Sequence, residues 1–283
     1  EALASVAAVS RMQITTSATG DGTAHAITVE GGEPTTPAPS SRARGTTVTV
    51  RDLFYNTPAR KKFMKSRRAE RMHMVRLFEQ LVTPFPTVHF SLVVEGKTVL
   101  DTPPVQSVRG RISQFAGTEF VKGLIACEGT FSDVGVTMLV SAPEHSSRRP
   151  RYQDLYVNLR RVDSDSVTFA VRNACRPFIP GDEKPSFFCF LDLDPSRVDV
   201  NVHPTKQRVK FDDERMVFGA IHRIVDTHVR GLAQQGGSSG AVDTAQAVAD
   251  SRPPPVEQKR GVSAVAETPA ETQGVLPFPG SAA

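Results

Sequence analysis

The residues best suited to chemistry lie in one stretch, residues 45–64, which reads GTTVTVRDLFYNTPARKKFM. Its first half alternates like a β-strand, with Val48 and Val50 on one side and threonines on the other. Pro58 fixes φ and keeps the preceding residue out of the helical region, so the strand must end at the Asn56-Thr57-Pro58 turn. A strand, a proline turn and a cationic helix start bring backbone amides and positive charges together, as phosphate binding requires. The stretch therefore predicts an anion site.

The positive charge of the chain is concentrated around this stretch. The net charge is only +4, yet eleven Lys or Arg residues lie between Arg42 and Arg76, against Asp52 and Glu70 alone. Because the rest of the chain is then net acidic, the distribution favours a polyanionic partner, although a solvated helix face is the plainer alternative. Few aromatic residues are interleaved, so base stacking is not indicated, and Phe54 and Tyr55 are interpreted as packing at the strand–turn corner.

Two basic clusters are candidates for a groove that contacts DNA phosphates without reading sequence. The residues assigned to DNA are Arg60, Lys61, Lys62, Lys65, Arg67 and Arg68 in the first cluster and Arg160 and Arg161 in the second. The second cluster also contains Arg148, Arg149 and Arg151.

Length and composition place the chain among soluble proteins. Its 283 residues, 39% hydrophobic and 23% charged, allow one or two globular domains and a tail. No apolar run approaches the roughly 20 residues that span a bilayer, so no membrane association is expected. The three cysteines form no CxxC pattern, which predicts buried thiols in a reducing compartment and no metal site. The chain lacks an initiator Met, and we expect a fragment of a longer protein.

The first part of the chain predicts a small sheet followed by a helix and a hairpin. The expected elements are a helix end over residues 1–10, strands over 11–18 and 25–30, a loop over 31–41, a helix from Ser66 and a hairpin over 88–100. Met74, Leu77, Phe78 and Leu81 form an apolar stripe on the helix, and its arginines lie largely off that stripe. The prolines at 84 and 86 end it.

The second part predicts an α/β unit. The expected elements are a helix over 108–115, strands near 124–130, 134–141, 155–162, 186–193, 198–204 and 207–211, and helices after residues 162 and 212. Residues 186–193 are continuously apolar, as in a strand buried on both faces. The last helix is expected to end near Gly231. Residues 234–283 are rich in Gly, Ser, Pro, Ala and Gln without apolar periodicity, which predicts a disordered linker.

Three stretches together resemble one family. GTTVTVRDLFYNTPARKKFMK, the YVNLR segment and VDVNVHPTKQRVKF, in this order, are similar to the N-terminal ATPase region of MutL-type DNA mismatch repair proteins. The opening EALAS resembles the end of that family's glycine-rich lid motif. The similarity extends to about residue 232.

The resemblance implies an α/β (α+β) fold in two domains. Residues 1–104 are expected to form the C-terminal part of a GHKL-type ATP-binding domain, and 105–233 a ribosomal-protein-like α/β domain, with the linker at 234–283. It also implies ATP binding and slow hydrolysis, coupled to dimerisation, DNA binding and activation of downstream repair factors.

The resemblance also assigns cofactor residues. ATP contacts are implied for Glu1, Ala2, Leu3, Thr46 and Lys206. From the residues alone, Thr46 is simply a strand start and Lys206 a solvated charge; in the family, the hydroxyl and the lysine reach the nucleotide phosphates. The family's general base, its Mg²⁺-binding Asn and its adenine-binding Asp-x-Gly-x-Gly precede the lid motif. They are not in this sequence, so no catalytic residue is assigned and the chain alone is expected to be inactive.

The implied partners are DNA, a mismatch-recognition protein of MutS type, a downstream nuclease or helicase and a second copy of the protein. The expected location, for a bacterial protein, is the cytoplasm with the nucleoid. Two alternatives remain: the ATPase subunit of another GHKL enzyme, such as a type II topoisomerase, and a non-catalytic nucleic-acid-binding module. The NTPAR and VNVHPTK segments favour the MutL-type assignment over the first.

Overall fold

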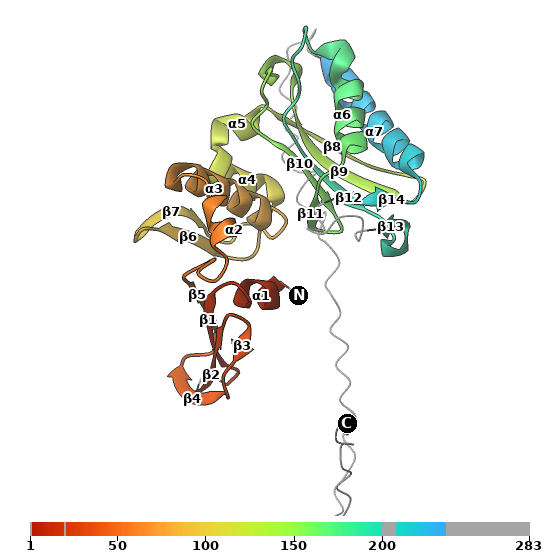
Figure 1. Cartoon of the computed structure of the whole chain (residues 1–283). Coiled ribbons are helices and arrows are strands. Elements are labelled where there is room, and N and C mark those ends of the chain that lie inside the picture. Colours follow the sequence, from red (N-terminus) through yellow and green to blue (C-terminus); the bar gives the residue numbers. More distant parts are fainter. Residues whose placement is uncertain (1, 20, 200–207, 236–283) are drawn as a thin grey trace, which may run out of the picture. The chain divides into compact units, whose positions relative to one another are not determined.

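The structure is a computed structural model and describes residues 2–19, 21–199 and 208–235, with side chains up to residue 231. A short helix, α1 (Ala2–Ala7), leads into a five-stranded antiparallel sheet with the order β3-β2-β1-β5 and β4 also paired to β2 (Figure 1). Its strands are β1 (Arg11–Ser17), β2 (Gly22–Glu30), β3 (Glu33–Pro34), β4 (Ala38–Arg42) and β5 (Gly45–Arg51). The three strands expected from alternation are confirmed.

The loop predicted over residues 31–41 is wrong in part, because this segment contains β3 and β4. Both strands pair with β2, and Pro39 lies opposite His25 in the β2–β4 register. Prolines argue against a strand because they lack the amide hydrogen that pairs with a neighbouring strand, but an edge strand tolerates them.

A helical segment and a hairpin follow the first sheet. They consist of α2 (Pro58–Lys62), α3 (Arg67–Val82), β6 (Phe90–Val94) and β7 (Lys97–Thr102). The Ser66 hydroxyl accepts a hydrogen bond from the Ala69 amide at 3.3 Å, which confirms the predicted cap. Glu95 and Gly96 have φ values of 52° and 74°, as a two-residue turn of a twisted hairpin requires. Both elements therefore form where the sequence predicts them.

The buried side of α3 is not its apolar stripe. Met74, Leu77 and Leu81 are 45%, 42% and 55% exposed, whereas Glu79 and Val82 are buried. The helix is confirmed, but the side that contacts the rest of the described chain is more polar than the spacing indicates. This side carries the residues that join α3 to the second sheet.

The second sheet has five strands in the order β11-β10-β12-β9-β8, and β10 and β12 are its parallel pair. Its elements are α4 (Val108–Ala116), α5 (Thr118–Lys122), β8 (Leu124–Phe131), β9 (Val134–Ser141), β10 (Gln153–Val157), β11 (Arg160–Val162), α6 (Asp165–Cys175), β12 (Phe187–Asp192) and α7 (Glu214–Gln235). The helices α6 and α7 lie side by side over the sheet (Figure 1).

The strand β12 is buried on both faces, as predicted. Phe187, Cys189 and Leu191 belong to the core that α6 and α7 cover. Phe188 belongs to the second cluster, together with Ile112 of α4. Because successive side chains of a strand point to opposite faces, a strand between two helical layers reads as a continuous apolar run.

Two boundaries in this part differ from expectation. The strand predicted over residues 155–162 is a hairpin, because Asn158 and Leu159 adopt positive φ values of 48° and 66° and form a two-residue turn between β10 and β11. The helix α7 extends to Gln235, beyond Gly231, since a glycine costs a helix only about 1 kcal/mol relative to alanine. Of the strands predicted over 198–204 and 207–211, the described residues contain β13 (Val198–Asp199) and β14 (Lys210–Phe211), and residues 200–207 lie outside the description. The predicted linker from residue 236 onward lies outside the described residues.

The cysteines conform to the prediction of buried thiols. Cys127, Cys175 and Cys189 are all free and buried, and burial raises the pKa of Cys127 and of Cys175 to about 12. In the described ranges, no helix is long and apolar enough to cross a membrane.

Candidate nucleic-acid interface and nucleotide-contacting residues

Thr46 lies at the start of β5, on the surface. The antiparallel register places it opposite Thr16, and the two hydroxyl oxygens are 2.8 Å apart. Gly45 has a φ of 130°, which a side chain would strain, and a Cβ there would lie 3.1 Å from Arg42 Nη2. Thr46 is thus an exposed residue at a strand start, and the Arg42 guanidinium lies beside the preceding glycine.

Of the other predicted nucleotide contacts, the structure describes Ala2 and Leu3, and these two are not gathered around Thr46. Ala2 and Leu3 are exposed residues of α1, which enters β1 at Arg11. Arg11 pairs with Arg51 at the opposite end of β5 from Thr46. Glu1 and Lys206 lie outside the described residues. The assignment of these five residues to nucleotide stays a prediction.

The turn after β5 is tied to the end of α1. The Asn56 side-chain amide donates to the Ala8 carbonyl at 2.9 Å, and the Phe54 amide donates to the Val9 carbonyl at 2.7 Å. The Arg11 guanidinium lies 4.8 Å from the centre of the Tyr55 ring. This ring therefore packs at the strand–turn corner, in agreement with the structural interpretation of the aromatic pair.

The basic segment after the turn is exposed. In the ranges that the structure describes, none of its six predicted DNA contacts forms a salt bridge: Arg60, Lys61, Lys62, Lys65, Arg67 and Arg68. Two of these arginines stand in the first turn of α3, where the helix dipole disfavours cations. A bound anion would reduce the repulsion among these cations. It would also offset the unfavourable interaction of the two arginines with the positive end of the helix dipole.

The tertiary structure forms a cleft between α3, which carries Arg68 of this segment, and a residue from the second half of the chain. The cleft has a volume of about 540 Å³ and is lined by Arg68, Arg71, Met72, Val75, Arg76 and Glu79 of α3 and by Arg151, two residues before β10. The sequence groups Arg71 and Arg151 with the basic clusters but does not show that they share one cleft, because 80 positions separate them.

Among the described salt bridges, Arg76 is the one arginine of this cleft that takes part. Its Nη2 donates to both carboxylate oxygens of Asp154 at 2.6 Å, and the Asp154 side chain is 1% exposed. Gln80 Nε2 donates to the same carboxylate at 2.8 Å, and the Tyr156 hydroxyl donates to the Gln80 carbonyl at 3.1 Å. This network joins α3 to β10. The one indication of this network in the sequence is Asp154, because a carboxylate within a buried strand needs a partner.

Arg160 and Arg161 do not line the cleft. Arg160 is an exposed residue of β11. Arg161 Nη1 lies 2.6 Å from Asp163 Oδ1, and its side chain is only 21% exposed. The Arg161 side chain is therefore engaged within the fold, and the structure does not place the pair with the other predicted DNA contacts.

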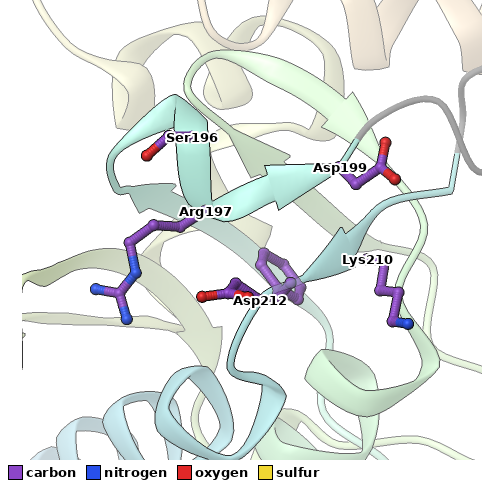
Figure 2. Close-up of a pocket in the computed structure, with 6 residues that line it drawn as sticks. Ser196, Arg197, Asp199, Lys210 and Asp212 are labelled. Atoms are coloured by element: carbon purple, nitrogen blue, oxygen red, sulfur yellow. The ribbon is translucent and has the colours of Figure 1, made fainter.

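A smaller hollow lies beside β13 and β14 (Figure 2). Its volume is about 270 Å³, and it is lined by Ser196, Arg197, Asp199, Lys210, Phe211 and Asp212. The two cations and two carboxylates of this lining balance, so its charge does not favour an anion. In the described part of the chain, no three His, Cys, Asp or Glu side chains are grouped to hold a metal ion.

Glu79 gives the larger cleft a pH dependence. Burial raises the pKa of this carboxyl, while the nearby Arg76 and Arg151 partly oppose the increase. Because the folded chain then binds the proton more tightly than the unfolded chain, the Glu79 contribution to the free energy of unfolding falls as pH rises from about 4.5 through the folded pKa. Below that window, a neutral Glu79 leaves the cleft more positive.

We expect Glu79→Gln to flatten the pH dependence of duplex DNA affinity, measured by fluorescence anisotropy at constant ionic strength. In the unsubstituted chain, affinity should weaken as Glu79 ionises. Glu70→Gln, on the same helix but outside the cleft, is the control and should leave the profile unchanged. Identical profiles for the unsubstituted chain and Glu79→Gln would contradict the prediction.

Comparison with known proteins gives the family. Residues 112–230 match the family model of the DNA mismatch repair protein, C-terminal domain. The DNA mismatch repair protein MutL of Paramagnetospirillum magneticum is 38% identical over 226 residues, which cover 78% of this chain and 37% of the relative. MutL of Herminiimonas arsenicoxydans is 39% identical over 239 residues, or 83% of this chain and 38% of the relative. The chain thus spans under two-fifths of the length of these relatives.

Solved structures share the fold. The N-terminal domain of a DNA repair protein aligns with a TM-score of 0.70 at 24% identity, over 83% of this chain and 75% of that one. The Aquifex aeolicus MutL ATPase domain complexed with ADP aligns with a TM-score of 0.57 at 19% identity, over 85% of this chain and 78% of that one. The expected α/β fold of GHKL type is confirmed. The family model, the sequence identities and the shared fold agree with the motif resemblance, and the chain belongs to the MutL family of DNA mismatch repair proteins.

Proposed function

We propose that this chain acts in DNA mismatch repair as the part of a MutL-type protein that links nucleotide binding to DNA contact. The observation that carries the proposal is the 38% identity to a MutL protein over 226 residues. The exposed basic segment and its cleft support the DNA contact, because uncompensated Lys and Arg side chains bind phosphates through counterion release.

The nucleotide part of the proposal is ATP binding and slow hydrolysis by the intact protein. A related ATPase domain was solved with ADP, which supports a nucleotide ligand. Of the described residues, Thr46 fits a phosphate contact because it is exposed at a strand start, and the cationic Arg42 side chain lies beside the preceding Gly45. Ala2 and Leu3, with Glu1 and Lys206, remain proposed contacts. We also propose Mg²⁺ as a cofactor, but no described group of side chains would hold it, and we derive no step through it.

The DNA part depends on long, exposed side chains and not on base-reading groups. Arg60, Lys61 and Lys62 follow one another on α2, so they present charge in several directions around one helical turn. Such a segment holds the phosphates of any sequence, as a protein that acts near any mismatch requires.

The remaining proposals concern organisation and partners. We propose a domain division near residue 104, between β7 and α4, with the domains 1–104 and 105–233 and a linker over 234–283. The proposed partners are DNA, a MutS-type mismatch sensor, a downstream nuclease or helicase and a second copy of the protein, in the cytoplasm. The relatives' names do not favour the topoisomerase alternative.

Replacing Lys61, Lys62 and Lys65 together with Glu should weaken binding of a labelled duplex by at least about 100-fold at low salt, because contacts to phosphates become repulsions. Affinity should be indifferent to sequence and fall linearly with salt on logarithmic axes. In the matched control, three lysines outside the basic segment are replaced with Glu: Lys97, Lys122 and Lys184. Equal affinities for the two triple variants would remove the proposed DNA surface.

A further inference from the structure

The cleft beside α3 has one wall from each half of the chain. Arg68 and Arg71 stand three positions apart on α3 and therefore share a face of the helix. Arg151 belongs to the segment that leads into β10. All three side chains are exposed, and the described salt bridges include none of them. Three guanidinium groups of like charge thus line one cleft.

The two carboxylates near these three arginines form their salt bridges with Arg76. Asp154 and Glu79 both contact Arg76, at 2.6 Å and 3.4 Å, and both are buried. Two carboxylates thus pair with Arg76, and Glu79 offsets only part of the remaining positive charge of the cleft. The three other arginines that line the cleft carry like charges, and a bound anion would offset their repulsion.

The Arg151 side chain stacks on the ring of Tyr152. Its guanidinium lies 5.0 Å from the ring centre, and the guanidinium of Arg76 lies 4.8 Å from the same centre. The ring itself is fully buried and packs against Phe115, Phe120 and Phe188, with centroid distances of 5.1–6.0 Å. A fixed ring restricts the long Arg151 side chain, so less rotamer entropy remains to be lost when Arg151 binds a ligand.

We propose that this cleft seats one backbone phosphodiester of nucleic acid, held between Arg71 of α3 and Arg151, with Tyr152 as the residue that positions Arg151. The inference rests on the proposed DNA function and extends it to a site shared by the two halves of the chain. A planar guanidinium can donate two parallel hydrogen bonds to phosphate oxygens, whereas a lysine ammonium acts as a point charge. The three arginines of the cleft are therefore better suited to a phosphate than lysines would be. A backbone phosphate fits better than a free one because the same helix begins with further exposed cations.

The shared phosphate has a consequence for the junction. The Arg76–Asp154 contact already joins α3 to β10, and a phosphodiester between Arg71 and Arg151 would add a second link beside it. Nucleic acid would then stabilise the association of α3 with the second sheet, because a ligand that bridges two elements stabilises the arrangement that it binds.

The first test is Arg151→Gln in the full chain, measured by anisotropy with a labelled DNA duplex over a range of salt. We expect about a tenfold loss of affinity at low salt and a decrease of about one in the salt slope. Arg215→Gln, an exposed arginine of α7 that lies outside both basic clusters and does not line the cleft, is the control. Equal losses for the two variants would overturn the site. Absence of any salt-dependent binding by the unsubstituted chain would overturn the proposed DNA function as well.

Two further variants test the geometry. Arg71→Gln combined with Arg151→Gln should lose little more affinity than either single variant, since both side chains hold the same phosphate; fully multiplicative losses would contradict a shared ligand. Tyr152→Phe keeps the ring and should keep the affinity, whereas Tyr152→Leu should match Arg151→Gln; equal affinities of Tyr152→Leu and Tyr152→Phe would exclude the positioning role. Displacement of the duplex by millimolar inorganic phosphate at constant ionic strength would overturn the phosphodiester assignment.

Discussion

Replacing Arg111 with Met will lower the free energy of unfolding by about 3–5 kcal/mol, because several buried carbonyls lose a charged hydrogen-bond donor at once. Arg111 is fully buried in α4. Its guanidinium donates to the carbonyls of Thr102, Phe85, Pro86 and Val88 and to Gln114 Oε1. Methionine fills a similar volume but donates nothing, so several buried carbonyls lose their partner.

The contacts of Arg111 explain why its loss should be so costly. Its partners in the described part of the chain include no carboxylate, and burial lowers the pKa of its guanidinium. The charge is held by backbone carbonyls of the segment between α3 and β6 and of the end of β7. Arg111 thereby fixes the connection between the hairpin and the first helix of the second part of the chain.

Arg109→Met is the matched control, two residues away on the same helix. Arg109 donates to two carbonyls, those of Val121 and Leu124, at 2.9 and 2.7 Å, and is only partly buried. We expect about 1–2 kcal/mol for this variant, because it leaves fewer acceptors unpaired. Urea denaturation measures both changes through the transition midpoint at an unchanged slope. A loss for Arg111→Met no greater than that for Arg109→Met would contradict the assigned role.

Asp154→Asn should lower the free energy of unfolding by about 3–5 kcal/mol, because it leaves the charge of Arg76 poorly compensated. Two hydrogen bonds of 2.6 Å join this carboxylate to Arg76, and the Asp154 side chain is 1% exposed. Asparagine retains the shape but not the charge and offers one acceptor oxygen where the carboxylate offers two.

A surface ion pair gives the contrast. Arg11 and Glu30 are 2.8 Å apart, yet their side chains are 51% and 56% exposed. Glu30→Gln should therefore cost at most about 1 kcal/mol, since solvent screens the pair. In a double-mutant cycle, Arg76→Met combined with Asp154→Asn should be less destabilising than the sum of the two single changes. Additive losses would show that the two side chains are not energetically coupled.

The fold was predictable where local pattern and tertiary environment agree. The stripe of Val167, Ala170, Val171 and Ala174 on α6 is buried as its spacing indicates. On α3 the same reasoning found the helix but not its buried side, because periodicity reports only which residues are apolar. Which side is covered depends on the elements that pack there, and the described elements reach Glu79 and Val82.

The candidate site shows the same limit. Arg71 and Arg76 lie on one helix and read alike in the sequence, but Arg71 is exposed and Arg76 is held by a carboxylate 78 positions away. Arg161 looked like a free cation and is paired with Asp163. Whether an arginine forms an internal salt bridge or can bind a ligand depends on which side chains lie beside it in the folded chain.

The sequence by itself determined the family, the order of most elements and the position of the basic segment, because motifs, periodicity and charge are properties of neighbouring residues. The tertiary structure decided which cations remain available and that Arg71 and Arg151 line one cleft. That pairing requires α3 to lie against β10, and the Arg76–Asp154 contact between them forms only when residues far apart in the chain are folded together.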